Sequence, residues 1–253
     1  NRRRWLYRQL IRSEIKVITV SNGLKEAFIH FGFKDRDVFV APDGVDMRLF
    51  SEHLDIAAAR QKLSLIQKIP IIGYVGQLKT LGMEKGIQEL FDAFEYVVDQ
   101  YPQALLLLVG GSQADIAHYQ KVISPKIKNS VSFAGYQEPW RVPLYLWACD
   151  VLVMPYPNEP HYAIYMSPLK LFEYMASGRP VVASDLPSVR EVLNSNNAIL
   201  VMPNDARDLA NGIQQILSKS DPGLRLANQA QSDVVRYSWD QRAKNIIKFI
   251  HEN

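Results

Sequence analysis

Short apolar runs alternate along most of this chain with polar or amphipathic stretches of helical length. Runs of this kind predict buried strands, and the stretches between them are typical of helices that cover a sheet. The pattern therefore predicts an α/β fold with a doubly wound parallel sheet of about six strands and helices on both faces. The six expected strands are 71–76, 104–109, 131–133, 151–154, 180–183 and 198–201.

Two further short runs precede this set. Residues 17–20 and 38–40 predict strands, and Ser21 has the right side chain to cap a helix that ends near Phe31. Another helix is expected at 55–63. These elements come before the six-strand series.

The composition is that of an ordinary globular protein. Of 253 residues, 47% are hydrophobic and 22% are charged, and the net charge of +3 is spread along the chain, so we expect no nucleic-acid partner. No apolar run reaches the roughly 18 residues of a membrane span. Cys149 is the only cysteine, which excludes an intramolecular disulfide and favours a reducing, cytoplasmic location. The histidines lack metal-ligand spacing and there is no P-loop, so we expect neither metal nor cofactor.

The segment 2–12 predicts a basic amphipathic helix. We expect this helix to pack on a neighbouring domain, and a peripheral contact with anionic lipid at the inner face of the membrane is the alternative. Its apolar side would consist of Leu6, Tyr7, Leu10 and Ile11, with Arg8 and Arg12 opposite.

The segment 166–185 carries the clearest chemical signal. Ser167 is a good N-cap, and Pro168 suits the first position of a helix, where no donor is needed. The free N–H groups of that first turn, together with Lys170, form a favourable place for a phosphate. Glu173 lies one turn further on the same side. The alternative is a surface helix with a Lys170–Glu173 pair worth a few tenths of a kcal/mol.

Glycine-containing turns follow the expected strands. In the loop 76–86, Gly76 lets the backbone approach a ligand and Lys85 supplies a positive charge, although Lys85 is also plausible as a solvated loop lysine. Gly110 and Gly111 are either a tight strand-to-helix turn or the border of a nucleotide, because ligands of open α/β sheets lie at the carboxyl ends of the strands. Tyr136 is either a stacking residue or a packing residue.

These motifs together resemble retaining glycosyltransferases of family 4, which are group 1 enzymes of the GT-B fold. The run Ser-Pro-x-Lys-x-x-Glu-Tyr-Met-Ala at 167–176 matches the donor-site signature of that family. The glycine turns and Lys85 come before it in the family's order. The resemblance covers most of the chain and implies a Rossmann-like C-terminal donor-binding domain.

The resemblance also implies roles for individual residues. The helix turn and Lys170 would bind the donor diphosphate, Glu173 would bind the ribose hydroxyls, and Lys85 and Lys170 would stabilise the departing diphosphate. The position of Tyr136 would read the base. The full set of implied donor-binding residues is Gly76, Gln77, Lys85, Gly110, Gly111, Tyr136, Ser167, Pro168, Leu169, Lys170 and Glu173.

Two positions depart from the family pattern. Gln77 replaces a cation that often follows the first glycine, which weakens one side of the diphosphate clamp unless Lys79 compensates. Tyr165 stands where the family usually has a first glutamate that touches the sugar. Glu159 and His161, in the proline- and tyrosine-rich loop 155–166, could reach the sugar instead, and the alternative is that this loop is a simple lid.

The resemblance implies a division into three parts. Residues 1–45 would be the last elements of an N-terminal acceptor domain and the crossing from it, 46–235 the nucleotide-sugar domain, and 236–253 a helix that returns to the first domain. We therefore expect the donor-binding half of a hexosyltransferase-like enzyme, inactive by itself and prone to self-association through its last helix. That helix carries Ile246, Ile247, Phe249 and Ile250.

The expected partners are a nucleotide-sugar and, through the missing domain, a glycan or lipid-linked sugar as acceptor. A noncatalytic nucleotide-sugar-binding module and a GT-B sugar-nucleotide epimerase are the alternatives. The first would keep Lys170 and Glu173, and the second would need a pair of acid/base carboxylates that the chain does not clearly show.

Overall fold

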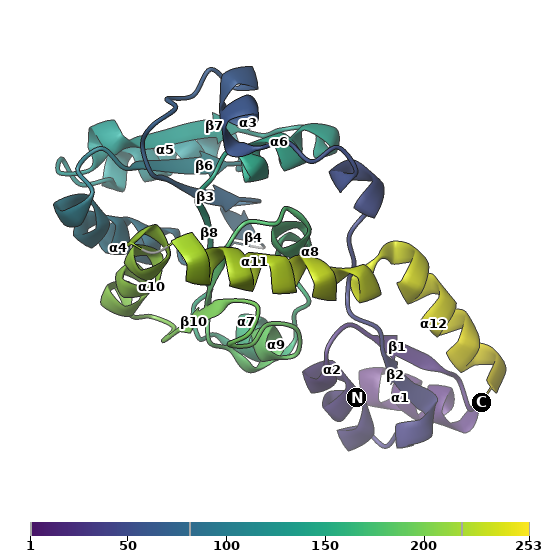
Figure 1. Cartoon of the computed structure of the whole chain (residues 1–253). Helices are drawn as coiled ribbons and strands as arrows, with labels where there is room; N and C mark the ends of the chain where they lie inside the picture. Colours follow the sequence, from purple (N-terminus) through teal and green to yellow (C-terminus); the bar gives the residue numbers. More distant parts are fainter. Residues whose placement is uncertain (1, 81, 219, 253) are drawn as a thin grey trace.

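A computed structural model describes residues 2–80, 82–218 and 220–252, which form a large α/β unit and a smaller unit at both ends of the chain (Figure 1). The central sheet of the large unit has six parallel strands in the order β10-β9-β8-β3-β6-β7. All six predicted strands are confirmed. They are β3 (Ile71–Val75), β6 (Leu105–Val109), β7 (Val131–Gly135), β8 (Val151–Met154), β9 (Val181–Ser184) and β10 (Ile199–Val201).

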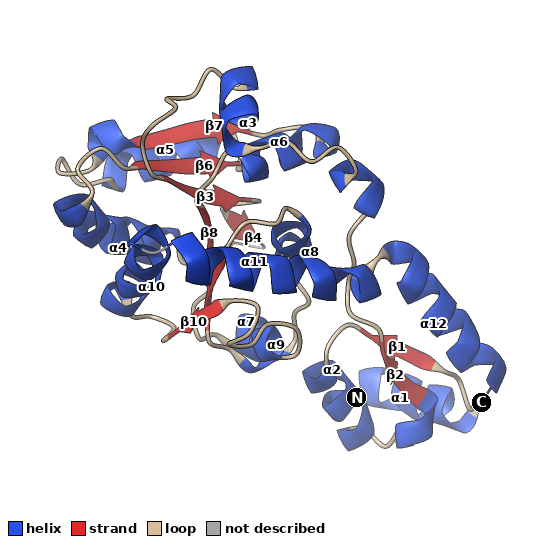
Figure 2. Ribbon diagram, in the orientation of Figure 1, coloured by secondary structure: helices blue, strands red, loops and turns tan. Residues whose placement is uncertain are grey.

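Helices cover both faces of this sheet, as the pattern predicts (Figure 2). Side chains alternate between the two faces of a strand, so Ile71 joins one core with Phe172 of α8, and Ile72 joins the other with Phe94 of α4. The helices of the large unit are α3 (Ile56–Lys62), α4 (Ile87–Gln100), α5 (Gln113–Val122), α6 (Val142–Trp147), α7 (Pro160–Ile164), α8 (Leu169–Ala176), α9 (Pro187–Arg190), α10 (Ala206–Ser218) and α11 (Ser220–Val234).

Short 3-10 turns join several of these elements. They are η1 (Asp35–Asp37), η2 (Met47–Phe50), η3 (Lys128–Ser130), η4 (Pro139–Arg141) and η5 (Val235–Tyr237).

The strand order places a topological switch point between β3 and β8. The chain runs outward from β3 through β6 to β7, then returns to the centre as β8 and runs outward the other way. The connections that leave the carboxyl ends of β3 and β8 therefore run in opposite directions. Open α/β sheets bind ligands at the carboxyl ends of the strands, where the connections diverge in this way.

The smaller unit contains both ends of the chain (Figure 1). The strands β1 (Val17–Thr19) and β2 (Val38–Val40) pair in parallel and are flanked by α1 (Arg2–Arg12), α2 (Asn22–His30) and α12 (Trp239–Glu252). The last helix lies against β2, because Phe39 stacks on Phe249 with ring centroids 5.0 Å apart and Arg242 Nε donates to the Pro42 carbonyl at 2.9 Å. The division at 45 and 236 into separate domains stays a prediction.

The two helices at the chain ends keep exposed apolar side chains. Tyr7 of α1 packs against Phe28 and Phe31 of the neighbouring helix region, whereas Trp5 and Leu6 are exposed. The side chains of Arg2, Arg3, Arg4 and Arg8 lie outside what the structure describes, so the lipid contact stays a prediction. Ile247 and Ile250 are exposed, and self-association also stays a prediction. Within the described residues, no helix is long and apolar enough to cross a bilayer.

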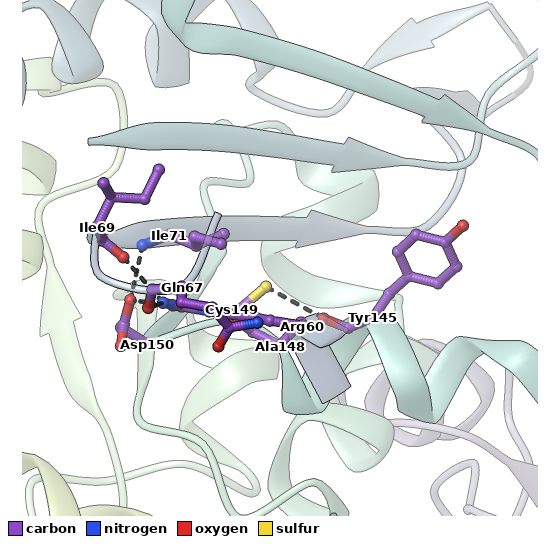
Figure 3. Close-up of polar contacts among 8 residues, drawn as sticks. All are labelled: Arg60, Gln67, Ile69, Ile71, Tyr145, Ala148, Cys149 and Asp150. Carbon is purple, nitrogen blue, oxygen red and sulfur yellow. Dashed lines mark hydrogen bonds and ion pairs between the residues drawn. The ribbon is translucent and has the colours of Figure 1, made fainter. Parts of the chain in front are cut away.

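A partly buried ion pair closes the amino edge of the sheet (Figure 3). Arg60 of α3 is 2% exposed, and its Nη2 donates to Asp150 Oδ2 at 2.7 Å. The same oxygen accepts the Ile71 N–H at 2.7 Å, so one carboxylate holds both α3 and the start of β3. Next to it, the Cys149 thiol is buried and has a pKa raised by burial to about 12, as expected of a structural cysteine.

We predict that Asp150→Ala lowers the free energy of unfolding by about 3–5 kcal/mol, because it leaves the Arg60 guanidinium buried without a counter-charge. Urea unfolding followed by circular dichroism measures this. Asp185→Ala is the matched control, since Asp185 pairs with the exposed Arg190 and should change stability little. Equal losses in the two variants would contradict a special role for Asp150.

Candidate functional site

The candidate site lies at the carboxyl ends of the central strands. Gly76 follows β3 directly, and its N–H donates to the Val109 carbonyl at 2.8 Å at the end of β6. Gly110 follows β6, and its N–H donates to the Gly135 carbonyl at 2.7 Å. The glycine turns expected to border a ligand are thus brought side by side at one edge of the sheet.

Lys170 of α8 occupies the centre of this edge. Its side chain is only 6% exposed, and its Nζ lies 3.6 Å from the centroid of the Tyr74 ring. This ammonium group has no hydrogen-bond partner in the described chain. Burial holds the pKa of Lys170 well below its usual value; the nearby Lys85 lowers it further, and Glu173 opposes that shift. Lys170 is thus a desolvated cation without a direct counter-ion.

Two glycines make room for this lysine. Gly76 has φ +142°, and a Cβ added there would lie 2.8 Å from Lys170 Cε. Gly110 has φ +108°, and its added Cβ would lie 2.3 Å from the Gly76 carbonyl oxygen. Any larger residue at either position would be strained and would displace the neighbouring atoms. Gly111, at φ +80°, is similarly confined by Leu78.

The segment 76–86, expected to be a loop, contains a β-hairpin. Its strands are β4 (Lys79–Thr80) and β5 (Met83–Glu84). Lys79 Nζ pairs with Glu84 at 2.9 Å within the hairpin, and its compensation for the cation missing at Gln77 stays a prediction. The Tyr119 hydroxyl of α5 also donates to Glu84, which ties the hairpin to α5.

Lys85 follows this hairpin and is half-buried. Burial lowers its pKa, and it is close enough to Lys170 to lower the pKa of that group as well. The next residue, Gly86, has φ +79° and packs so tightly that a Cβ would lie 1.6 Å from the Pro155 carbonyl oxygen. The two lysines predicted from sequence therefore come together, each held by an ordered element.

The predicted start of α8 is wrong in detail. Pro168, not Ser167, is the N-cap, and α8 has no side-chain cap. The Ser167 hydroxyl instead accepts the Asp43 N–H at 2.8 Å, because the crossing segment from the smaller unit passes this turn and supplies a donor. Leu169, the first helical residue, has an exposed side chain. The prediction that Ser167 is the N-cap of this helix is therefore wrong.

Glu173 lies one turn after Lys170, as the spacing predicts. Its carboxylate is half-buried and makes no hydrogen bond in the described part of the chain. Burial raises the pKa of Glu173, and Lys170 acts in the opposite direction. The carboxylate is therefore available to accept from a ligand hydroxyl.

Gln77 and Tyr136 lie at the surface. The Tyr136 side chain is 69% exposed, and its ring makes no aromatic contact within the described residues. Gly135 before it has φ +65°. The structure therefore does not support the alternative that Tyr136 is a packing residue.

The loop 155–166 contains a residue that the sequence analysis missed. Tyr162 of α7 stacks on Tyr156 with centroids 4.9 Å apart, and Tyr156 in turn lies 5.3 Å from Lys170 Nζ. Tyr162 is 2% exposed, yet its hydroxyl has no partner in the described chain. Glu159 and Tyr165, by contrast, are exposed. The only sequence signal was the density of tyrosines in this loop, which does not say which hydroxyl is buried unpaired.

Comparisons with known proteins agree with this architecture. The chain is 27% identical to a D-inositol 3-phosphate glycosyltransferase of Corynebacterium urealyticum, over 95% of this chain and 57% of that protein. It is 29% identical to a phosphatidyl-myo-inositol mannosyltransferase of Mycobacterium tuberculosis, over 84% of this chain and 53% of that protein. The chain thus spans about half the length of these curated relatives.

Solved structures show the same fold. HepE of Anabaena, in complex with UDP, superposes with a TM-score of 0.75 at 25% identity, over 94% of this chain and 64% of that one. Sucrose-phosphate synthase from Thermosynechococcus elongatus gives a TM-score of 0.75 at 26% identity, over 93% and 57%. Residues 69–219, which include the whole central sheet and the Lys170 site, match the family described as glycosyl transferases group 1. This chain belongs to that family.

Proposed function

We propose that this chain carries the donor site of a retaining glycosyltransferase of family 4, which transfers a sugar from a nucleoside-diphosphate sugar to an acceptor hydroxyl. The observation that carries the proposal is the buried, unpaired ammonium of Lys170 next to Lys85. Two desolvated cations that repel each other are costly in an empty site, and a diphosphate would neutralise both. The UDP complex of HepE and the names of the curated relatives support this direction.

The proposed roles follow from the position of each group. Lys85 and Lys170 would stabilise the negative charge that develops on the diphosphate as the bond between the sugar C1 and the phosphate oxygen breaks. The backbone at Gly76, Gly110 and Gly111 would lie close to the donor. Glu173 would accept from the ribose hydroxyls. Two lysines would supply the charge that other transferases take from a metal ion, so we propose that no metal is required.

The proposed site also includes the Tyr162 hydroxyl, which would donate a hydrogen bond to the nucleotide-sugar. A buried hydroxyl without a partner costs free energy, and a phosphate or sugar oxygen of the donor would satisfy it. Its backbone carbonyl accepts from Ser188 Oγ at 2.5 Å, which holds α7 against α9. Tyr162 would therefore be positioned before the donor arrives.

The acceptor, in this proposal, is a glycan or lipid-linked sugar bound by a separate domain, and the enzyme acts in the cytoplasm. Calorimetric titration with a panel of UDP-, GDP- and ADP-sugars tests the donor proposal and identifies the base. Binding of at least one nucleotide-sugar, with competition by its nucleoside diphosphate, is the expected result. A folded protein that binds none of them would overturn the proposal.

We expect Lys170→Met to weaken UDP binding by tenfold or more, because a charge-assisted hydrogen bond contributes about 1.5–3 kcal/mol. The same variant should bind uridine as the parent does. The same change should raise the melting temperature or leave it unaltered, because an unpaired buried charge is replaced by an apolar chain of similar shape. Titration and thermal unfolding measure the two effects. Lys85→Met should show the same selectivity for the diphosphate, and a loss of uridine binding in either variant would indicate misfolding instead.

The affinity for UDP should fall as the pH rises above the lowered pKa of Lys170, once the phosphates are ionised. Lys170 has a lowered pKa in the free protein, and a bound diphosphate would raise it, so binding takes up protons above the free pKa. In Lys170→Arg the side chain stays charged, and the pH dependence should become shallower. Identical pH profiles for the two proteins would contradict a role for Lys170 charge.

Glu173→Ala should reduce UDP affinity about tenfold or more and should reduce the affinity for 2′-deoxy-UDP less, because the variant has lost the acceptor for a ribose hydroxyl. Glu159→Ala, at an exposed position in the adjacent loop, is the matched control and should bind both nucleotides as the parent does. If Glu173→Ala weakens the two nucleotides equally, Glu173 does not bind the 2′-hydroxyl.

A further inference from the structure

A cavity lies at the amino edge of the central sheet, opposite the edge that carries Lys170. Its volume of about 440 Å³ falls within the range of about 300–1,000 Å³ that is usual for small-molecule pockets. It is bounded by the segments that enter β3, β8 and β9, and by α3, α10 and the start of α11. The lining residues that matter here are Arg60, Lys68, Asp150, Arg179, Ile216 and Leu224.

The positive charges of this cavity exceed the negative ones. Every guanidinium nitrogen of Arg60 has a partner: the nitrogens donate to the carbonyls of Ala148, Gln67 and Ile69 as well as to Asp150 (Figure 3). Asp150 is therefore already neutralised by one guanidinium. Arg179 and Lys68 add two further cations and have no ion-pair partner in the described residues.

Arg179 is the unusual member of this group. Its Nε is buried without a hydrogen-bond partner, and its Nη2 makes one long contact of 3.4 Å with the Leu54 carbonyl. Burial lowers the pKa of Arg179, although an arginine stays protonated. A partly desolvated guanidinium with unused donors is well suited to bind an oxyanion through two parallel hydrogen bonds.

The part of the lining that comes from α10 and α11 is apolar. Ile216 and Leu217 at the end of α10, together with Leu224 of α11, line the cavity, and the large Leu224 side chain is exposed at its rim. A ligand that fits both walls has a charged head and an apolar body. Inorganic anions would leave the apolar wall uncovered.

We propose that this cavity binds a small amphiphilic anion, whose phosphate or carboxylate head pairs with Arg179 and whose apolar part lies against α10 and α11. The site is separate from the donor site: Arg179 comes just after the C-terminal end of α8, and Lys170 is in its first turn. The proposal does not depend on the function proposed above.

Hexyl phosphate is a suitable probe, with inorganic phosphate and 1-hexanol as the two half-ligands. Titration of the full chain, followed by calorimetry, should show hexyl phosphate binding at least about tenfold tighter than either half, because both walls contribute. Saturating UDP should not compete. Absence of binding, competition by UDP, or equal affinity for inorganic phosphate and hexyl phosphate would each overturn the proposal.

Two variants assign the binding to this cavity. Arg179→Gln should weaken hexyl phosphate about tenfold or more, and Leu224→Ser should weaken hexyl phosphate but not inorganic phosphate. Arg207→Gln, at an arginine outside the cavity, is the matched control and should bind normally. Thermal unfolding checks that each variant is folded. Unchanged hexyl phosphate binding in folded Arg179→Gln would place the ligand elsewhere and overturn the proposal.

Discussion

The burial of the Lys170 ammonium over the Tyr74 ring is the interaction around which the carboxyl edge of the sheet is built. A desolvated cation–π contact contributes about 2 kcal/mol, whereas a buried ion without a counter-charge costs several kcal/mol. The contact at 3.6 Å therefore offsets only part of the cost. It also requires Gly76 and Gly110, because a side chain at either position would occupy the space of Lys170 or of the backbone next to it.

Elements around Lys170 are fixed by bonds that do not involve it. The Tyr74 hydroxyl donates to the Gln77 carbonyl at 2.8 Å, and the Tyr174 hydroxyl both accepts the Val75 N–H and lies 3.1 Å from the Val75 carbonyl. The hairpin that precedes Lys85 is tied to α5 through Glu84. Charged groups held in this way need little reorganisation when an anion binds, which is the condition for effective electrostatic stabilisation.

Buried cationic side chains have different partners at the two edges of the sheet. At the amino edge, each guanidinium nitrogen of Arg60 has a hydrogen-bond partner and one of these partners is Asp150, so the charge is compensated and serves stability. At the carboxyl edge, Lys170 has no such partner among the described residues, and an anionic ligand would offset the free-energy cost of its burial. Arg179 lies at the amino edge, like Arg60. Its buried Nε nevertheless has no partner among the described residues, which makes Arg179 more similar to Lys170 than to Arg60.

The sequence by itself determined the six-strand series, the glycine turns and the pair Lys170 and Glu173, because apolar runs, glycine positions and helical spacing are local signals. Only the tertiary structure decided that Ser167 accepts from Asp43 rather than capping its own helix, and that Lys79 is paired within a hairpin. It also decided that the Tyr162 hydroxyl and Arg179 Nε are buried without a hydrogen-bond partner among the described residues. These outcomes depend on atoms contributed by segments far apart in the chain, such as Asp43 and Ser167, and local patterns carry no information about which distant donor, acceptor or charge will be nearby.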